Sequence, residues 1–457
     1  MCDAMRTENE NLLMAEKIAA AVSAAGGRAF YVGGFVRDRV RGMPGKDIDL
    51  EIHAVPYEVL TGILSKLGQV KVMGASFGVF GLKGYDLDIA MPRREKATGR
   101  GHRDFAVYTD PFIGPEKAAL RRDFTMNAMM QDVLTGEILD FFNGKEDLEK
   151  GTVRHVNGDT FAEDPLRVLR AAQFAARFGF TVAEETRDLC RDMALETLSK
   201  ERIMGELEKA LLKAERPSVF FRELREMNQL SCWFPEVERL IGVPQNPVYH
   251  PEGDVWNHTM ATLDEAAALR EAAAFPKAFM LAALCHDFGK ILTTAEFDGV
   301  IHAYRHETEG IPLIEAFLQR LTNETELKRY VLNMAQLHMR PNMMVDQRSS
   351  EKAYMRLFDE SLCPEDLLLL AKADHLSSGS SGDYAAKEAY LRERLGRYRI
   401  LMEQPQVQGR DLLEAGMAPG PEMKEAIAFA RKLHLAGVKK EEALTQTLGV
   451  FRKRRGL

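Results

Sequence analysis

The spacing of hydrophobic and polar positions differs between two parts of the chain. Between residues 29 and 90, short apolar runs and alternating stretches are typical of β-strands. Strands are predicted near residues 29–33, 46–53, 69–73, 77–82 and 85–90. Helical spacing predicts helices over 11–25 and near 56–67, and from about residue 146 it continues almost without interruption. The pattern therefore predicts an α+β domain, with a small mixed sheet and helices, followed by helical domains.

Clusters of proline, glycine and serine mark the expected domain boundaries. Pro244, Pro247 and Pro251 stand between two helical stretches, and the run Ser-Ser-Gly-Ser-Ser-Gly at residues 377–382 predicts a flexible joint. The length of 457 residues is enough for about three domains at ~150 residues each. We expect a head over residues 1–145, a helical neck over 146–240, a histidine-bearing helical domain over 241–376 and a helical tail over 377–457.

Composition narrows the class of protein. Hydrophobic residues make up 46% and charged residues 28%, as in ordinary soluble globular proteins. No apolar run approaches the ~18 residues of a membrane span, and the N-terminus lacks a signal-peptide pattern. The five cysteines show no paired spacing, which favours a reducing cytoplasm over a disulfide framework. A net charge of −7 argues mildly against general nucleic-acid binding, so local patches must carry any contact with RNA.

A glycine pair followed by two aspartates is the first candidate for chemistry. Gly33 and Gly34 end an apolar run and permit close approach of a ligand, and Arg37 follows on an expected helical turn. Asp47 and Asp49 alternate with apolar residues, so they point to the same face of a strand. At ~6 Å and an effective dielectric constant of ~20, their repulsion costs roughly 3 kcal/mol. A solvated pair on an edge strand would repel less, but Mg²⁺ carrying a nucleoside triphosphate explains both the pair and the glycines.

Residues 31–51 resemble the head of the polymerase-β-like nucleotidyltransferases. The resemblance is closest to the class II tRNA nucleotidyltransferases, or CCA-adding enzymes, and to the bacterial poly(A) polymerases related to them. It implies that Asp47 and Asp49 bind Mg²⁺. It also implies that Asp88 is the third carboxylate, which activates or positions the attacking RNA 3′-hydroxyl. Asp86 lies two residues away on the same face of the strand and is the alternative.

Two further strings belong to the same head. Residues 121–128, Arg-Arg-Asp-Phe-Thr-Met-Asn-Ala, are nearly identical to a string of this family, and the resemblance implies that Gly34, Arg37 and Arg122 contact the nucleotide. Two arginines that open a helix would suit phosphate groups, although a surface ion pair is the simpler interpretation. The composition of residues 92–105 indicates a solvated basic loop. The family has a mobile loop here that is needed for the final adenosine, which favours complete CCA addition.

A basic helix in the neck is the candidate for base selection. Asp164, Arg167 and Arg170 recur at helical spacing and share one face, as they would in a plain amphipathic helix with an ion pair. An Asp–Arg edge could also accept cytosine and adenine, which carry an amino group beside an acceptor, and reject the other bases by ~1–3 kcal/mol. The resemblance implies that Asp164 and Arg167 read the base without a nucleic-acid template. Gln173 stands where many relatives have arginine, and the next helix, residues 199–207, is interpreted as a scaffold.

The third domain carries a histidine and aspartate pattern. The string Leu284–Lys290, Leu-Cys-His-Asp-Phe-Gly-Lys, resembles the signature of HD phosphohydrolases. The candidate metal ligands are His258, His286, Asp287 and Asp374, with His306 and His338 as further candidates. Imidazole and carboxylate ligands suit a transition metal such as Ni²⁺, or Mg²⁺, and such an ion could activate water for attack on a phosphoester. A lone histidine is more often a core residue, but the whole set implies phosphatase or 2′,3′-cyclic phosphodiesterase activity.

The predicted fold is a polymerase-β-like nucleotidyltransferase head followed by all-helical neck, HD and tail domains. The predicted reaction is template-independent addition of CCA to the 3′ end of tRNA from CTP and ATP with Mg²⁺, which releases pyrophosphate. Residues 72–80 lack the arginine-rich string expected of bacterial poly(A) polymerases, and the basic tail end, Arg452–Arg455, is expected to help grip tRNA. Poly(A), A-only or CC-only addition, a metal phosphohydrolase with a nucleotide-binding head, and a non-catalytic RNA-binding scaffold are the alternatives. The oligomeric state stays open.

Overall fold

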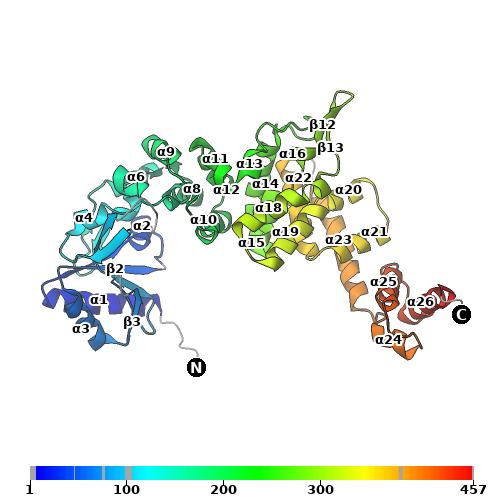
Figure 1. The fold of residues 1–457 in the computed structure, drawn as a ribbon, viewed down its shortest axis with the longest axis horizontal. Coiled ribbons are helices and arrows are strands. Elements are labelled where there is room, and N and C mark those ends of the chain that lie inside the picture. Colours follow the sequence, from blue (N-terminus) through cyan, green and yellow to red (C-terminus); the bar gives the residue numbers. More distant parts are fainter. Residues whose placement is uncertain (1–6, 46, 75–77, 98–104, 380–383, 455–457) are drawn as a thin grey trace. The chain divides into compact units, whose positions relative to one another are not determined.

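The computed structural model describes residues 7–45, 47–74, 78–97, 105–379 and 384–454. The chain forms two compact units, whose elements are labelled in Figure 1. The first unit contains Met1–Ala210 with Val219–Trp233, and the second contains Leu211–Ser218 with Phe234–Leu457. This division lies close to the predicted boundary between residues 240 and 241. The other predicted boundaries stay predictions.

The first unit begins with alternating strands and helices. It continues with helices, among which the short strands β10 and β11 occur. Its strands are β1 Arg28–Val32, β2 Ile48–His53, β3 Val70–Gly74, β4 Val79–Leu82, β5 Leu87–Ala90, β6 Arg93–Ala97, β7 Phe105–Thr109, β8 Met130–Asp132, β9 Ile138–Leu139, β10 Thr152–Val153 and β11 Thr181–Val182. Its helices are α1 Glu8–Ala24, α2 Gly34–Val40, α3 Tyr57–Leu67, α4 Pro115–Ala119, α5 Thr125–Ala128, α6 Gly144–Lys150, α7 Gly158–Ala162, α8 Leu166–Phe178, α9 Glu184–Arg191, α10 Lys200–Lys213, α11 Ser218–Glu226 and α12 Leu230–Trp233.

The core of the head is a seven-stranded mixed sheet in the order β3-β4-β5-β2-β1-β8-β9. Strands β2 and β5 pair in parallel, and the other neighbours pair antiparallel. Alternation along β2 buries Ile48, Leu50 and Ile52 on one face and turns Asp49 and Glu51 to the other. Helix α1 packs against β1, β2 and α3 (Figure 1). The apolar half of the alternation therefore forms the core and leaves the acidic half for chemistry.

The α+β head followed by a mostly helical chain is confirmed. The short strands β8 and β9, which complete the sheet, were not among the predicted strands. The flanks of the expected basic loop at 92–105 form the antiparallel pair β6–β7, and residues 98–104 lie outside the described chain. The parallel pair β10–β11 and the hairpin β12–β13 interrupt a region that was expected to be helical throughout. Each pair is short, so its alternation is too brief to stand out from the surrounding helical period.

Helix α8 positions the basic face that the sequence predicted. It follows Pro165 and ends at Gly179, whose φ of 68° gives the left-handed conformation that commonly terminates a helix. Val168 and Leu169 are fully buried on its apolar side. The opposite side carries Arg167 and Arg170, so packing of the apolar stripe aims the arginines away from the core.

The second unit is mostly helical. Its elements are α13 Pro235–Glu238, α14 Val255–Leu269, η1 Arg270–Ala272, α15 Pro276–Cys285, α16 Lys290–Thr293, β12 Thr294–Phe297, β13 Val300–Ala303, α17 His306–Glu309, α18 Ile311–Leu321, α19 Thr325–Leu337, α20 Arg340–Asp346, α21 Glu351–Glu360, α22 Pro364–Ser377, α23 Tyr384–Glu403, α24 Gly409–Glu414, α25 Glu422–His434 and α26 Lys440–Arg454.

Two features of the second unit matter for function. Helices α14, α15, α19 and α22 pack on one another and form the frame of the histidine cluster. Helices α24, α25 and α26 share a separate apolar cluster that includes Leu412, Ala426 and Ala443. The predicted joint begins at the last residue of α22, and residues 380–383 lie outside the described chain. Among the helices of the described ranges, none is both long enough and apolar enough to cross a bilayer.

Candidate functional site

Two carboxylates of the head stand side by side on neighbouring strands. Asp49 on β2 and Asp88 on β5 are partners in the parallel register, so their side chains point to the same face. Asp47 is exposed and lies just before β2. Burial and the negative charge of Asp88 raise the pKa of Asp49 to about 6; Arg122 opposes this shift and Asp47 adds to it. The three predicted carboxylates therefore interact electrostatically around Asp49.

Glu51 belongs to the same row of carboxylates, and Asp47, Asp49, Glu51 and Asp88 are called the acidic row below. Glu51 was missed in the sequence, although it continues the alternation of Asp47 and Asp49. Its Oε1 lies 2.8 Å from His53 Nε2, and its Oε2 accepts a hydrogen bond of 3.1 Å from Arg122 Nη2. Burial alone would raise the pKa of Glu51, but these two partners hold it below its ordinary value. Glu51 is thus an ionised anchor that fixes Arg122 next to the carboxylates.

A cavity of about 580 Å³ opens beside the carboxylates. Asp49 and Asp88 line it together with six arginines of the described chain: Arg93, Arg121, Arg122, Arg167, Arg170 and Arg202. Gly33 has a φ of 67°, and a Cβ there would lie 3.4 Å from Asp49 Oδ2 and 3.5 Å from Arg122 Nη1. Because guanidinium groups bind phosphate oxygens well, the cavity can hold a polyphosphate next to the acidic row.

Gly34 and Arg37 do not line this cavity, and their contact with the nucleotide stays a prediction. The guanidinium of Arg37 is buried, donates to Asp38 at 2.8 Å and to Asn127 at 2.9 Å, and lies over the ring of Phe178. Gly34 opens α2, and a Cβ there would approach only Arg37. Arg37 therefore packs α2 against α8. Its burial depends on contacts distant in sequence, which the local motif does not reveal.

The basic face of α8 is engaged differently from the predicted pairing. Asp164 accepts hydrogen bonds of 3.0 and 2.9 Å from Arg202 Nη2. Arg167 donates from Nη1 to the carbonyl oxygen of Thr160 at 2.6 Å and from Nη2 to that of Arg121 at 2.8 Å. Arg202 was assigned to a scaffold helix, but its side chain lines the cavity. Residues 199–207 therefore contribute the side chain of Arg202 to the cavity, in addition to their predicted role as a scaffold.

Arg170 lines the cavity but is held by an acidic partner. Its Nε donates to Asp123 Oδ2 at 2.8 Å, and Asp123 Oδ1 accepts from Asn127 Nδ2. Burial opposes ionisation of Asp123, yet the charge of Arg170 and the hydrogen bonds keep its pKa below the ordinary value. Gln173 is buried, and its Nε2 has no hydrogen-bond partner within the described ranges. Arg170 therefore fixes α8 to the head, and Gln173 stays inside the packing.

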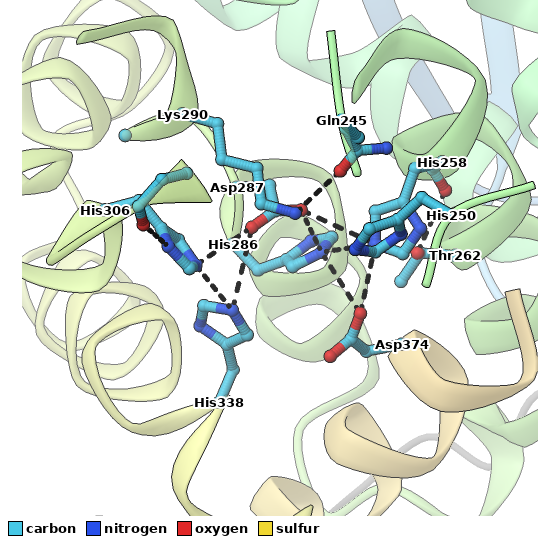
Figure 2. A network of polar contacts seen from close by, with 12 residues as sticks. Gln245, His250, His258, Thr262, His286, Asp287, Lys290, His306, His338 and Asp374 are labelled. Atoms are coloured by element: carbon cyan, nitrogen blue, oxygen red, sulfur yellow. Dashed lines mark hydrogen bonds and ion pairs between the residues drawn. The ribbon is translucent and has the colours of Figure 1, made fainter. Parts of the chain in front are cut away.

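The six histidine and aspartate residues predicted for the HD site lie together in the second unit. Figure 2 shows His306 and His338 on one side of Asp287, and His258 and Asp374 on the other. The Nε2 atoms of four histidines surround the Asp287 carboxylate, at 3.5 Å for His258 and 3.3 Å for His286 to Oδ2, and at 3.2 Å for His306 and 3.7 Å for His338 to Oδ1. One pair of imidazoles, His258 and His286, thus faces Oδ2 of Asp287, and the other pair, His306 and His338, faces Oδ1.

Local backbone contacts set the orientation of three of these rings. The Nδ1 atoms of His286, His306 and His338 lie 2.8, 2.8 and 2.6 Å from the carbonyl oxygens of Ala283, Ala303 and Ala335. A carbonyl oxygen only accepts, so each Nδ1 carries the hydrogen and donates it. In the neutral ring this leaves the Nε2 lone pair directed at Asp287. Each contact spans three residues at a helix or strand end, so local geometry creates the donor set.

His258 is oriented by a carboxylate instead. Its Nδ1 lies 2.8 Å from Glu252 Oε1, and its Nε2 lies 3.0 Å from Asp374 Oδ1. Burial lowers the pKa of His258, but its hydrogen bonds with Asp374 and Glu252 raise it to about 9. Burial and the neighbouring His286 and His306 lower the pKa of His338 to about 3, so this ring is neutral. A bound cation would replace the proton of His258.

The chemistry of this donor set fits divalent metal. Two groups, one of His258, His286 and Asp287 and the other of Asp287, His306 and His338, each place their ligand atoms within 4.8 Å of one another. All of these side chains are buried, and imidazole with carboxylate is a usual ligand set for transition metals. The shared Asp287 could therefore serve two ions.

Glu252 and Lys290 complete the cluster and were not predicted to take part. Lys290 is buried, and its Nζ lies 2.7 Å from Asp287 Oδ2 and donates to Gln245 Oε1 at 2.8 Å. Lys290 follows Asp287 by three residues within Leu284–Lys290, and this helical spacing could have predicted their contact from the sequence. Glu252 precedes His258 by six residues, so only the fold reveals its contact.

We expect Glu252→Gln to weaken divalent-metal binding at the HD site by roughly 10- to 100-fold, because a ligand histidine depends on its outer partner for tautomer and orientation. The amide can present either a donor or an acceptor to His258, whereas the carboxylate always accepts. Titration calorimetry with Ni²⁺ measures the change. Glu296→Gln, at an exposed residue of β12, is the matched control. Equal affinity of the Glu252 variant and the parent would show that Glu252 does not orient His258.

The geometry defines a class of protein, a nucleotidyltransferase head joined to an HD-type metal domain. A family model described as "Poly A polymerase head domain" matches residues 29–154. A model described as "Probable RNA and SrmB-binding site of polymerase A" matches 179–241, and the "HD domain" model matches 255–379. The Multifunctional CCA protein of Haemophilus ducreyi is 39% identical over 317 residues, which cover 68% of this chain and 74% of that protein.

The match extends further in another bacterium. The Multifunctional CCA protein of Pseudomonas fluorescens is 34% identical over 428 residues, 91% of this chain and 100% of that protein. The chain belongs to this CCA-adding family of nucleotidyltransferases, as the motifs predicted. Its fold is similar to that of the Bacillus stearothermophilus CCA-adding enzyme in complex with CTP, with a TM-score of 0.67, 22% identity and coverage of 99% and 100% of the two chains. The Thermotoga maritima CCA-adding enzyme complexed with tRNA gives a TM-score of 0.63 at 20% identity, over 98% and 97%.

Proposed function

We propose that the protein adds C, C and A to the 3′ end of tRNA, using CTP and ATP and releasing pyrophosphate. The observation that carries this proposal is the paired Asp49 and Asp88 beside an arginine-lined cavity, in a chain of the CCA-adding family. Incorporation of each labelled nucleoside triphosphate into tRNA that lacks its 3′ end, with product length read on a gel, tests it. Three added residues from CTP and ATP are expected. Long A-only products would identify a poly(A) polymerase instead.

The acidic row fits Mg²⁺. Carboxylate oxygens are the ligands that this ion prefers. Burial, together with the negative charge of Asp88, raises the pKa of Asp49, and a bound cation would stabilise its ionised form. Asp47 and Asp49 would hold the ion, which would supply charge neutralisation for the triphosphate. Arg122, fixed by Glu51, would orient the phosphate groups. Asp88 would accept the proton of the attacking 3′-hydroxyl.

Asp164 and Arg167 are proposed to select the base, with Arg202 as an additional member of the set. The Asp164 carboxylate lines the cavity and would accept from the amino group of cytosine or adenine. Arg202 Nη2 donates to the Asp164 carboxylate and would keep it oriented toward the base. Two donors of Arg167 serve the carbonyl oxygens of Thr160 and Arg121, and these contacts hold its guanidinium at the cavity.

Asp164→Ala is expected to lower the preference for CTP and ATP over UTP and GTP by roughly 10- to 100-fold, the value of one good polar contact with a base. The reason is loss of the acceptor that pairs with the amino group. The ratio of kcat/KM for the four nucleotides measures it. Asp159→Ala, at an exposed residue of α7 outside the cavity lining, is the control. Unchanged selectivity in the Asp164 variant would remove this residue from base recognition.

The second candidate function is hydrolysis of phosphoesters at the HD site, as a phosphatase or a 2′,3′-cyclic phosphodiesterase. It is favoured by the convergence of four imidazole nitrogens on Asp287. Ni²⁺ or Mg²⁺ would be held by His258, His286, Asp287 and Asp374, with His306 and His338 as further ligands. The ion would supply Lewis acidity at the phosphoester. Turnover of 2′,3′-cyclic AMP in the presence of Ni²⁺ or Mg²⁺ is the expected result.

We propose that the tail, residues 377–457, binds tRNA, because its 15 lysines and arginines outnumber its 10 acidic residues although the whole chain has a net charge of −7. We also propose that the enzyme acts in the cytoplasm, where its proposed substrates, tRNA and nucleoside triphosphates, occur. The proposed domain limits are those predicted from the sequence: 1–145, 146–240, 241–376 and 377–457.

A further inference from the structure

A group of exposed aromatic rings lies beside the cavity that the HD residues Asp287, His306 and Asp374 line. Tyr304 follows β13 directly and is 63% exposed, and Tyr249 is 68% exposed. The rings of His302 and Tyr304 are stacked, with centroids 4.8 Å apart and planes only 11° from parallel. Phe297, on the other strand of the hairpin, has its ring centroid 6.2 Å from that of Tyr304. Large apolar rings in water are costly, so a group of them next to a cavity indicates a binding surface.

The aromatic rings and the candidate metal ligands line the same cavity. It has a volume of about 830 Å³, within the ~300–1,000 Å³ usual for small-ligand sites. Asp287, His306 and Asp374 line its acidic and imidazole part, and Tyr249, His302 and Tyr304 line another part. Tyr304 also precedes His306 by only two residues along the chain. A ligand whose phosphoester reached the metal ligands would therefore have aromatic faces available to its remaining atoms.

We propose that Tyr304, stacked on His302, is a platform for the nucleobase of the phosphoester substrate at the HD site. The proposal rests on the hydrolase function proposed above and adds the substrate feature that the site recognises. A flat tyrosine face backed by a second ring matches the face of a base, and stacking of this kind tolerates every base. The larger ring system of purines covers more of the platform. The site therefore takes nucleoside phosphoesters with a purine preference and has little affinity for phosphoesters that lack a base.

The alternative is that these rings only stiffen the hairpin β12–β13. Phe297 contacts both His302 and Tyr304, so mutual packing contributes to hairpin stability. Packing within the hairpin does not explain why Tyr304 and His302 line the cavity whereas Phe297 does not. The two explanations differ in the effect of Tyr304 on substrates with and without a base.

The test compares adenosine 2′,3′-cyclic phosphate with glycerol 1,2-cyclic phosphate, which has the same reacting diester and no base. Tyr304→Ala is expected to raise KM for the adenosine substrate by roughly 5- to 100-fold, the loss expected for one stacked base. It should leave kcat/KM for the glycerol substrate unchanged. Tyr304→Phe keeps the ring and should behave as the parent protein. In the parent, adenosine 2′,3′-cyclic phosphate should have a lower KM than uridine 2′,3′-cyclic phosphate.

The outcomes separate this proposal from the hydrolase proposal. Equal KM for the adenosine substrate in the parent and Tyr304→Ala would overturn the platform, and so would an equal loss with the glycerol substrate. If the parent hydrolyses neither substrate, the hydrolase proposal fails, and equilibrium binding of labelled adenosine 2′,3′-cyclic phosphate without metal ion decides the platform. Binding that weakens in Tyr304→Ala and persists in Tyr304→Phe would support it. Identical binding in all three proteins would overturn it.

Discussion

Asp49→Asn is expected to abolish nucleotide incorporation and at the same time to stabilise the metal-free protein. The catalytic loss should be at least about 100-fold, as for removal of one preorganised electrostatic contact to a transferring phosphoryl group. The gain in stability follows from the pKa of Asp49, which rises from 3.8 in the unfolded chain to about 6 in the folded one. Above pH 6 the folded protein must ionise a carboxylate that its surroundings disfavour, and asparagine has no such charge.

The sign of this effect depends on pH. A group whose pKa is raised on folding reduces stability as pH increases from 3.8 through 6, and it has no effect when both states are protonated. The shift corresponds to an upper limit of about 3 kcal/mol, and solvent screening of the partly exposed site reduces it to roughly 1–2 kcal/mol. The stability difference between Asp49→Asn and the parent should therefore be largest above pH 6 and vanish only as the pH falls well below 3.8. Added Mg²⁺ should narrow it, because the ion stabilises only the parent carboxylate.

Thermal unfolding in EDTA and in Mg²⁺, together with single-turnover incorporation of CTP, measures both halves of this prediction. Asp86→Asn is the matched control, because Asp86 is exposed, lies two residues from Asp88 and does not line the cavity. It should keep the parent activity and unfolding temperature. An Asp49→Asn protein that incorporates CTP at the parent rate would show that the paired strands β2 and β5 do not hold the reaction centre.

The acidic row shows what sequence alternation reveals and what it leaves out. The period of two placed Asp47 and Asp49 on one face and the apolar residues of β2 on the other. It could not show that Asp49 is opposite Asp88, because that register depends on a parallel pairing between strands distant in the chain. Glu51 was within reach of the same alternation and was missed because it follows the two recognised aspartates.

The arginines show a second limit. Arg37 stands in a recognisable motif, yet its guanidinium is buried under Phe178, which comes from a helix more than a hundred residues later. Arg202 looked like part of a scaffold and also pairs with Asp164. A guanidinium can reach several partners, so its role is set by tertiary packing. The histidine cluster was easier to predict, because the string Leu284–Lys290 resembles a known signature. The structure adds that the Nδ1 contacts of His286 and His338 to carbonyls three residues earlier are local in the chain.

Asp287→Asn should have the opposite effect on stability from Asp49→Asn, although both remove a proposed metal ligand. Asp287 is buried with Lys290, whose Nζ lies 2.7 Å away. Burial alone would raise the pKa of Asp287, but Lys290 and His286 hold it well below its ordinary value. The ionised carboxylate therefore stabilises the folded protein when the pH is above the pKa of the unfolded chain, and this stabilisation is lost as the pH falls through the lower pKa of the folded protein. Removing one member of a buried ion pair costs roughly 3–5 kcal/mol. Asparagine therefore leaves Lys290 buried with Gln245 as its remaining polar partner among these residues.

The same substitution should reduce hydrolysis of 2′,3′-cyclic AMP by at least about 100-fold, since both imidazole pairs lose the carboxylate between them. Incorporation of CTP and ATP should persist below the lowered unfolding temperature, because Asp287 belongs to the second unit and the acidic row to the first. Asp298→Asn is the control: this exposed residue has a φ of 51°, a conformation that asparagine accepts well. If Asp287→Asn were as stable as the parent in EDTA, the ion pair with Lys290 would not contribute to folding. If it also retained hydrolysis, the cluster around Asp287 would not be the hydrolytic centre.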